Sequence, residues 1–70
     1  TDHPGLIEML TAREMDVLGL LAENKTNPEI ARQLVLSGET VKVHLKHIFQ
    51  KLEVADRRQA VRRAHELDLI

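Results

Sequence analysis

The most regular pattern of apolar positions in this chain lies in residues 37–52. Apolar side chains recur there at i, i+4, i+7 and i+11, the spacing that forms one stripe along an α-helix. These positions are Val41, Leu45, Ile48 and Leu52, and Phe49 widens the stripe. The opposite side of the same helix carries a valine between two lysines: Lys42, Val43 and Lys46. The pattern therefore predicts one helix with a buried face and a second face that is not purely polar.

Two shorter helices are predicted before this one. The first begins after Thr11, because Thr11 and Glu14 have the spacing of a capping box, in which each side chain bonds the other residue's backbone N–H. It ends near Asn24, since asparagine tolerates the left-handed conformation that closes many helices. The second begins at Pro28, whose missing N–H costs nothing at the first helical position, and Asn27 is predicted as its N-cap.

The long helix begins after Ser37, which has the short polar side chain of an N-cap. A fourth helix follows, with Asp56 at its N-cap and Gln59 where it would complete another capping box. Leu69 and Ile70 are expected to fold back as an apolar end. The apolar stripe of the fourth helix is Ala60, Val61, Ala64 and Leu67.

Four helices with short connections and no strand-like alternation predict an all-α fold. The tight connection between residues 28–34 and residues 38–52 places the long helix across the one before it, as in a helix-turn-helix. Many such turns contain a glycine, because the turn requires a positive φ that a β-branched residue resists. Val35 therefore predicts a different turn geometry here, for example one residue longer.

The length of 70 residues allows one small domain. Residues 1–9 contain Pro4 and Gly5 and are predicted to be a linker or a partly ordered leader. Residues 10–70 are predicted to form the helix-turn-helix domain. Its core must be aliphatic, because Phe49 is the one aromatic residue in the sequence.

The formal net charge of -1 argues at first against a nucleic-acid partner. The distribution of charge argues the other way, because residues 42–63 hold seven basic and two acidic residues. Salt screens a remote acidic surface within roughly 8–10 Å, so the local basic region matters more than the sum. On charge alone, a DNA-binding surface and an ordinary solvated surface of mixed charge both remain open.

Many positions between residue 10 and about residue 70 match one known pattern in the right order. These positions are Leu10-Thr11, Arg13-Glu14, Val17-Leu18, Asn27, Glu29-Ile30-Ala31, Leu36-Ser37, Thr40-Val41-Lys42, His44, Lys51-Leu52, Val54, Arg57 and Gln59-Ala60-Val61. With them, the sequence resembles the DNA-binding domain of the LuxR/NarL/GerE family. The leading LIE and the closing RAHELDLI are most similar to the C-terminal domains of MalT-like regulators.

The resemblance implies a third helix that enters the major groove of DNA and a fourth helix that carries a dimer contact. Positions that match Lys42, Val43 and Lys46 face bases or nearby phosphates in the family. Two positions depart from the family pattern. Asn24 stands where glycine is usual, and Asp56 stands where asparagine is common, so its carboxylate either weakens a phosphate contact or caps the helix better.

The predicted DNA-binding residues extend beyond the three on the long helix. A valine can touch a thymine methyl group, while lysines reach phosphates or guanine edges. Glu39 would accept from a cytosine amine or only favour the helix N-terminus, and Ser37 would lie near a phosphate or serve only as a cap. Free N–H groups beside Asn27 would hold a phosphate. The full predicted set is Lys42, Val43, Lys46, Glu39, Thr40, Gln50, Asn27, Ser37, Arg57 and Arg58.

Other chemistry finds little support in the sequence. There is no cysteine, no glycine-rich phosphate loop and no arrangement for nucleophilic catalysis. His44 and His47 are three residues apart but lack a third metal ligand nearby. We therefore expect no enzyme activity, no metal and no cofactor.

The expected protein is the cytoplasmic output domain of a bacterial transcription regulator. Its partners would be double-stranded DNA and a second copy on that DNA, with no membrane contact. An N-terminal sensor or regulatory domain would precede this chain. The alternative hypothesis is a helical protein-interaction or dimerisation module that does not bind DNA.

Overall fold

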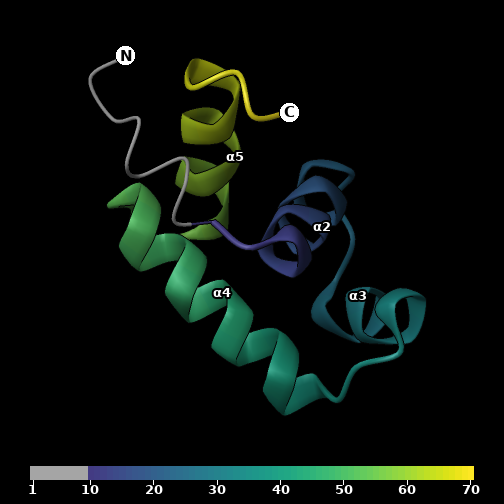
Figure 1. Ribbon diagram of the computed structural model, residues 1–70. Helices are drawn as coiled ribbons and strands as arrows, with labels where there is room; N and C mark the ends of the chain where they lie inside the picture. Colours follow the sequence, from purple (N-terminus) through teal and green to yellow (C-terminus); the bar gives the residue numbers. More distant parts are fainter. Residues whose placement is uncertain (1–9) are drawn as a thin grey trace.

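The computed structural model describes residues 10–70, so the prediction for residues 1–9 lies outside the described residues. Four α-helices follow one another, and the described part of the chain contains no strand. Their labels follow Figure 1. They are α2 (Ala12–Ala22), α3 (Asn27–Leu34), α4 (Gly38–Leu52) and α5 (Arg57–Glu66). The predicted all-α fold is confirmed.

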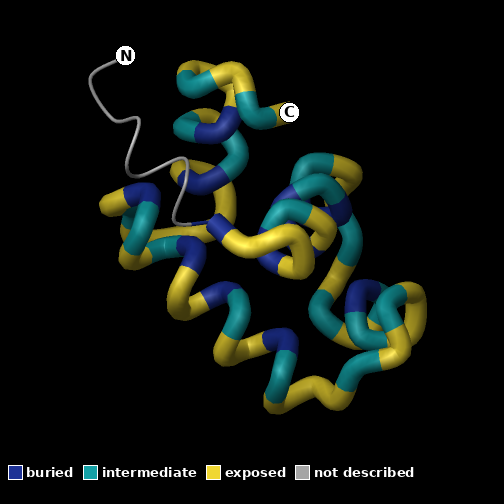
Figure 2. The backbone as a smooth tube through the Cα atoms, in the orientation of Figure 1, coloured by how far each residue is buried: buried dark blue, intermediate teal, exposed yellow. Residues whose placement is uncertain are grey.

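The long helix α4 forms one side of the molecule and packs against the other three helices, and α2 also packs against α3 and α5. In Figure 1, α3 lies near the beginning of α4 and α5 lies near its end, with α2 between them. Figure 2 shows that the buried positions of each helix face the centre of this arrangement. The core is aliphatic, as predicted: Leu10, Val17, Leu18, Leu20, Leu21, Ile30, Val41, Leu45, Ile48, Leu52, Ala60 and Ala64.

The helix starts follow the local sequence, with one correction. The Thr11–Glu14 capping box is present, with both hydrogen bonds formed. The cap of α3 is Thr26, whereas Asn27 was predicted; Asn27 is instead the first helical residue. The reason is that Thr26 and Glu29 form a second capping box, which stabilises a start one residue earlier. The sequence contains the Thr26–Glu29 spacing of this capping box, but Pro28 favoured a start one residue later with Asn27 as its cap.

One hydrogen bond at the start of α5 differs from the predicted capping box. Asp56 is the N-cap, as expected, and its side chain accepts from the Gln59 N–H at 2.9 Å. The Gln59 side chain, however, accepts from the Ala55 N–H at 2.9 Å instead of from Asp56. At the end of the chain, Leu69 packs against the core, but Ile70 is 37% exposed and does not fold back fully.

All four helices end in the same way, with a non-glycine residue at positive φ. Asn24 has this conformation, as predicted. At each end, the next backbone N–H bonds a carbonyl five residues earlier, which satisfies a free carbonyl of the last turn. The four residues at positive φ are Asn24, Val35, Glu53 and Asp68.

The prediction of an altered turn at Val35 is wrong. Val35 adopts the left-handed conformation itself, with φ 56° and ψ 52°. Its side chain is 88% exposed, so the branched Cβ does not press on packed neighbours. The Leu36 N–H bonds the Ala31 carbonyl at 2.8 Å and closes the helix behind it. This closure and the burial around α3 and α4 outweigh the local preference of valine.

Candidate nucleic-acid interface

The two faces of α4 separate as predicted. Val41, Ile48 and Leu52 are fully buried and Leu45 is 8% exposed, so one face belongs to the core. The other face is exposed and presents its cations to solvent. Val43 is 49% exposed among them, so an apolar side chain stands between the cations of this face. The exposed positions of this face are Glu39, Lys42, Val43, Lys46 and Gln50.

A shallow groove of about 400 Å³ lies along one flank of this face. Its walls are mainly apolar, with Phe49 and Val54 beside the stems of two lysines. A lysine can rest its carbon stem on such a surface while its ammonium stays in water. The groove therefore offers an apolar surface to the stems of Lys42 and Lys46 and leaves their charges available to a ligand. Its lining is Lys42, Leu45, Lys46, Phe49, Gln50 and Val54.

The N-terminus of α4 is held by Ser37 and Thr40. The Ser37 side chain accepts from the Thr40 N–H at 3.1 Å, and the Ser37 hydroxyl donates to Thr40 Oγ1 at 2.9 Å. Ser37 is therefore an N-cap, whether or not it also lies near a phosphate. Glu39 lies 3.9 Å from Lys42, with both side chains largely exposed, so this ion pair is weak.

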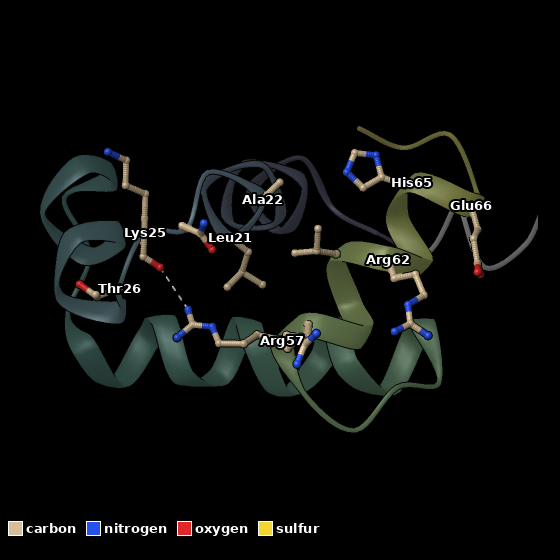
Figure 3. Close-up of a pocket in the computed structure, with 11 residues that line it drawn as sticks. Leu21, Ala22, Lys25, Thr26, Arg57, Arg62, His65 and Glu66 are labelled. Atoms are coloured by element: carbon tan, nitrogen blue, oxygen red, sulfur yellow. Dashed lines mark hydrogen bonds between the residues drawn. The ribbon is translucent and has the colours of Figure 1, made fainter.

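Arg57 and Asn27, which are far apart in the sequence, lie together. Arg57 Nη2 donates to Asn27 Oδ1 at 3.1 Å and to the Lys25 carbonyl at 3.2 Å. Figure 3 shows the Arg57 side chain extending from α5 toward the loop between α2 and α3. The start of α5 is thereby attached to the start of α3, and both candidate phosphate contacts occupy one region of the surface.

A second groove, of about 660 Å³, lies between α5 and the end of α2 (Figure 3). Leu21 and Val61 contribute apolar surface to it. Several cations also line it, and no residue of α4 does. Arg58 lines this groove and does not line the groove along α4. The basic side chains of the groove are Lys25, Arg57, Arg58, Arg62 and His65.

One polar cluster was missed by the sequence reasoning. The Glu14 side chain is 4% exposed, and its Oε1 lies 2.7 Å from Lys51 Nζ. The same Oε1 accepts from the Thr11 N–H at 3.0 Å, and Oε2 lies 3.7 Å from His47 Nδ1. Burial raises the pKa of Glu14, but the Lys51 ammonium and the Thr11 N–H outweigh it, and the pKa is lowered. One feature of the sequence indicated this cluster: His47 and Lys51 are four residues apart and therefore lie on the same side of α4.

The histidines of α4 have different surroundings. His44 is partly buried, and its Nδ1 is buried without a hydrogen-bond partner. His47 faces Glu14 with half of its side chain exposed. Within residues 10–70, no group of three His, Cys, Asp or Glu side chains has an arrangement that suits a metal ion. In the same described part of the chain, no helix is long and apolar enough to cross a membrane.

Comparison with known proteins agrees with this geometry. Residues 8–64 match the family described as bacterial regulatory proteins, luxR family. The chain belongs to the luxR family. Its fold matches the structure of the transcription factor GerE with a TM-score of 0.80 and 35% identity, covering 86% of this chain and 90% of that one. The resemblance and the helix-turn-helix fold predicted from the sequence are thus confirmed.

Two curated relatives show how this luxR-family domain relates to longer proteins. The transcriptional regulatory protein LiaR of Bacillus subtilis is 48% identical over 63 residues, which are 90% of this chain and 30% of LiaR. The HTH-type transcriptional regulator MalT of Vibrio cholerae is 39% identical over 71 residues, 94% of this chain and 8% of MalT. The chain therefore spans less than a third of the length of either transcription regulator.

Proposed function

We propose that this domain binds double-stranded DNA sequence-specifically by inserting α4 into the major groove. The observation that carries the proposal is the exposed face of α4, where Lys42, Val43 and Lys46 stand opposite a buried apolar stripe. An α-helix fits the major groove, where each base pair presents a distinct pattern of donors, acceptors and methyl groups. Val43 is the candidate for contact with a thymine methyl group.

The remaining candidate residues have positioning roles in this proposal. Phosphate contacts fix the register of a protein on DNA, and base contacts supply the sequence preference. Ser37 and Thr40 lie at the N-terminus of α4, close to where the phosphate backbone of one DNA strand would pass. Asn27 and Arg57 form a second contact region at the start of α3. Glu39 and Gln50 lie at the two ends of the exposed α4 face, and Arg58 extends the basic surface onto α5.

We also propose that two copies pair on DNA through α5 and that a regulatory domain precedes this domain in the full-length protein. The support for the second point is the small share of LiaR and MalT that the chain covers. The support for the first is the groove beside α5, where Val61 and Leu21 contribute apolar surface. A helical module for protein contacts alone does not explain the exposed lysine–valine–lysine face.

The test combines sequence selection with salt-dependent binding. The domain should select a preferred duplex from a random pool. Lys42→Ala and Lys46→Ala should melt like the parent but bind DNA more weakly, and removing one phosphate-binding lysine should reduce the salt slope by about 1. Val43→Ala should instead relax the preference for one thymine while leaving non-specific binding nearly unchanged. Parent-like binding by both lysine variants would favour the protein-interaction alternative.

A further inference from the structure

The buried carboxylate of Glu14 joins the beginning of α2 to the last turns of α4. Its Oε1 lies 2.7 Å from Lys51 Nζ, and its Oε2 lies 3.7 Å from His47 Nδ1. The Glu14 side chain is 4% exposed, so it has no route to a DNA molecule on the surface of α4. Whatever it contributes to DNA binding must act through its partners on α4.

The capping box determines where this carboxylate points. Oε1 accepts from the Thr11 N–H at 3.0 Å, while the Thr11 hydroxyl accepts from the Glu14 N–H at 3.1 Å. The capping box therefore orients the Glu14 side chain independently of Lys51. A fixed acceptor with a charged donor gives a short, directional bond, which is stronger than one between neutral groups.

The apolar packing between α2 and α4 does not fix direction in the same way. Burial of Leu45 and Ile48 is favourable over a range of small rotations and shifts, because the hydrophobic effect is non-directional. A charged hydrogen bond at one point restricts that range. We propose that Glu14, with Lys51 as its partner, is a positioning residue that fixes the angle of α4 for sequence readout.

The position of the bond along α4 makes this restriction effective. Lys51 and Lys42 are nine residues apart, about 13 Å along a helix that rises 1.5 Å per residue. A tilt of about 10° at Lys51 would therefore move the Lys42 backbone by about 2 Å. Binding groups must be held within about 0.5 Å of the productive geometry, so such a tilt would disrupt base contacts. Phosphate contacts made by long lysine side chains adapt more easily.

This inference rests on the proposed function and predicts a particular loss. Glu14→Gln keeps an acceptor for the capping box but removes the charge. We expect the ratio of specific to non-specific DNA affinity to fall about tenfold, which corresponds to the removal of about one good base interaction. Simple destabilisation does not give this result, because an unfolded fraction lowers both affinities by the same factor.

The control variant is Arg13→Met. Arg13 lies on α2 beside Glu14 and forms an exposed ion pair with Asp16 at 3.5 Å. Its replacement changes the net charge of the domain by the same amount as Lys51→Met, so general electrostatic attraction to DNA falls equally in both. The ratio should stay at the parent value in Arg13→Met and fall in Lys51→Met. In the double variant Glu14→Gln/Lys51→Met, the ratio should fall no further than in Lys51→Met. The reason is that both changes remove the same bond between Glu14 and Lys51.

The experiment uses the duplex that the parent domain selects and a scrambled duplex of equal length, at a temperature where circular dichroism shows folded protein. If Lys51→Met does not fold, Glu14→Gln alone provides the test. The Glu14→Gln variant should fold because the Lys51 side chain is partly exposed, so its ammonium can reach water after the carboxylate is removed. An unchanged ratio in Glu14→Gln overturns the proposal. A lower salt slope with an unchanged ratio in Lys51→Met also overturns it, since Lys51 would then be a phosphate contact. Failure of the parent to select any duplex would instead contradict the proposed function.

Discussion

Arg57 Nη2 lies 3.1 Å from Asn27 Oδ1, so the first residue of α5 is bonded to the first residue of α3. Both residues were predicted as DNA contacts, and the structure gives them a contact with each other. The two roles are compatible, because a guanidinium has five N–H donors and this bond uses one Nη2 group. Arg57 can therefore hold the α2–α3 loop and still face a phosphate.

Replacing Arg57 separates these roles. Arg57→Ala should lower the free energy of unfolding by about 1 kcal/mol or less, because the hydrogen bonds that it removes are exposed. It should also lower DNA affinity and reduce the salt slope by about 1. Arg58→Ala is the matched change on the neighbouring residue and should leave stability unchanged. Thermal melts and binding titrations at two salt concentrations test this, and an unchanged salt slope in Arg57→Ala would assign Arg57 to structure alone.

The buried face of α4 should dominate stability. Ile48 is fully buried, and truncation leaves a cavity in a small aliphatic core. Ile48→Ala should therefore cost about 2–5 kcal/mol of unfolding free energy. Gln50→Ala, two residues along on the exposed face, should change it by no more than about 0.5 kcal/mol. Urea denaturation measures both, and similar values for the two variants would contradict the assignment of faces.

Val35 is expected to be a site of local strain. The left-handed conformation costs a non-glycine residue about 1–2 kcal/mol, while glycine has a larger entropy in the unfolded chain. Because the Val35 side chain is exposed, its removal sacrifices little packing, and Val35→Gly should stabilise the domain by about 0.5–1 kcal/mol. Val43→Gly, inside α4, should destabilise it. A destabilised Val35→Gly variant in chemical denaturation would show that the valine side chain makes stabilising contacts.

The lowered pKa of Glu14 should appear as a dependence of stability on pH. The unfolded chain binds a proton near the ordinary glutamate pKa of ~4.3, while the folded domain resists protonation to lower pH. The contribution of Glu14 is therefore present above that pKa and is lost as the pH falls through the folded value. Glu14→Gln should show a shallower loss of stability on acidification. A slope equal to that of the parent in melts between neutral and acidic pH would exclude Glu14 as a source.

The oligomeric state should depend on DNA. The exposed side of α5 carries Arg58 and Arg62, and pairing two such surfaces brings like charges together. We expect a monomer at micromolar concentration and a pair on DNA, with half-sites about 10 bp apart or a multiple of that spacing. Sedimentation with and without the selected duplex measures this. A tight dimer without DNA would contradict the expectation.

The sequence by itself determined the features that depend on neighbouring residues. Helix starts at Thr11, Ser37 and Asp56 follow from side chains that bond N–H groups three residues away. The two faces of α4 follow from the period of the helix, so Val43 was recognised as exposed and Ile48 as buried. The candidate DNA-binding surface was available for the same reason, because residues on one helical face are related by fixed spacing.

The tertiary structure alone decided which distant side chains meet. Glu14 and Lys51 are 37 residues apart, and Arg57 and Asn27 are 30 apart, and neither pair has a spacing that local rules relate. Both contacts depend on how the helices are rotated and crossed, which results from packing the whole core. The same packing overrode the local preference of Val35, because the gain from closing α3 against α4 exceeds the cost of one strained residue.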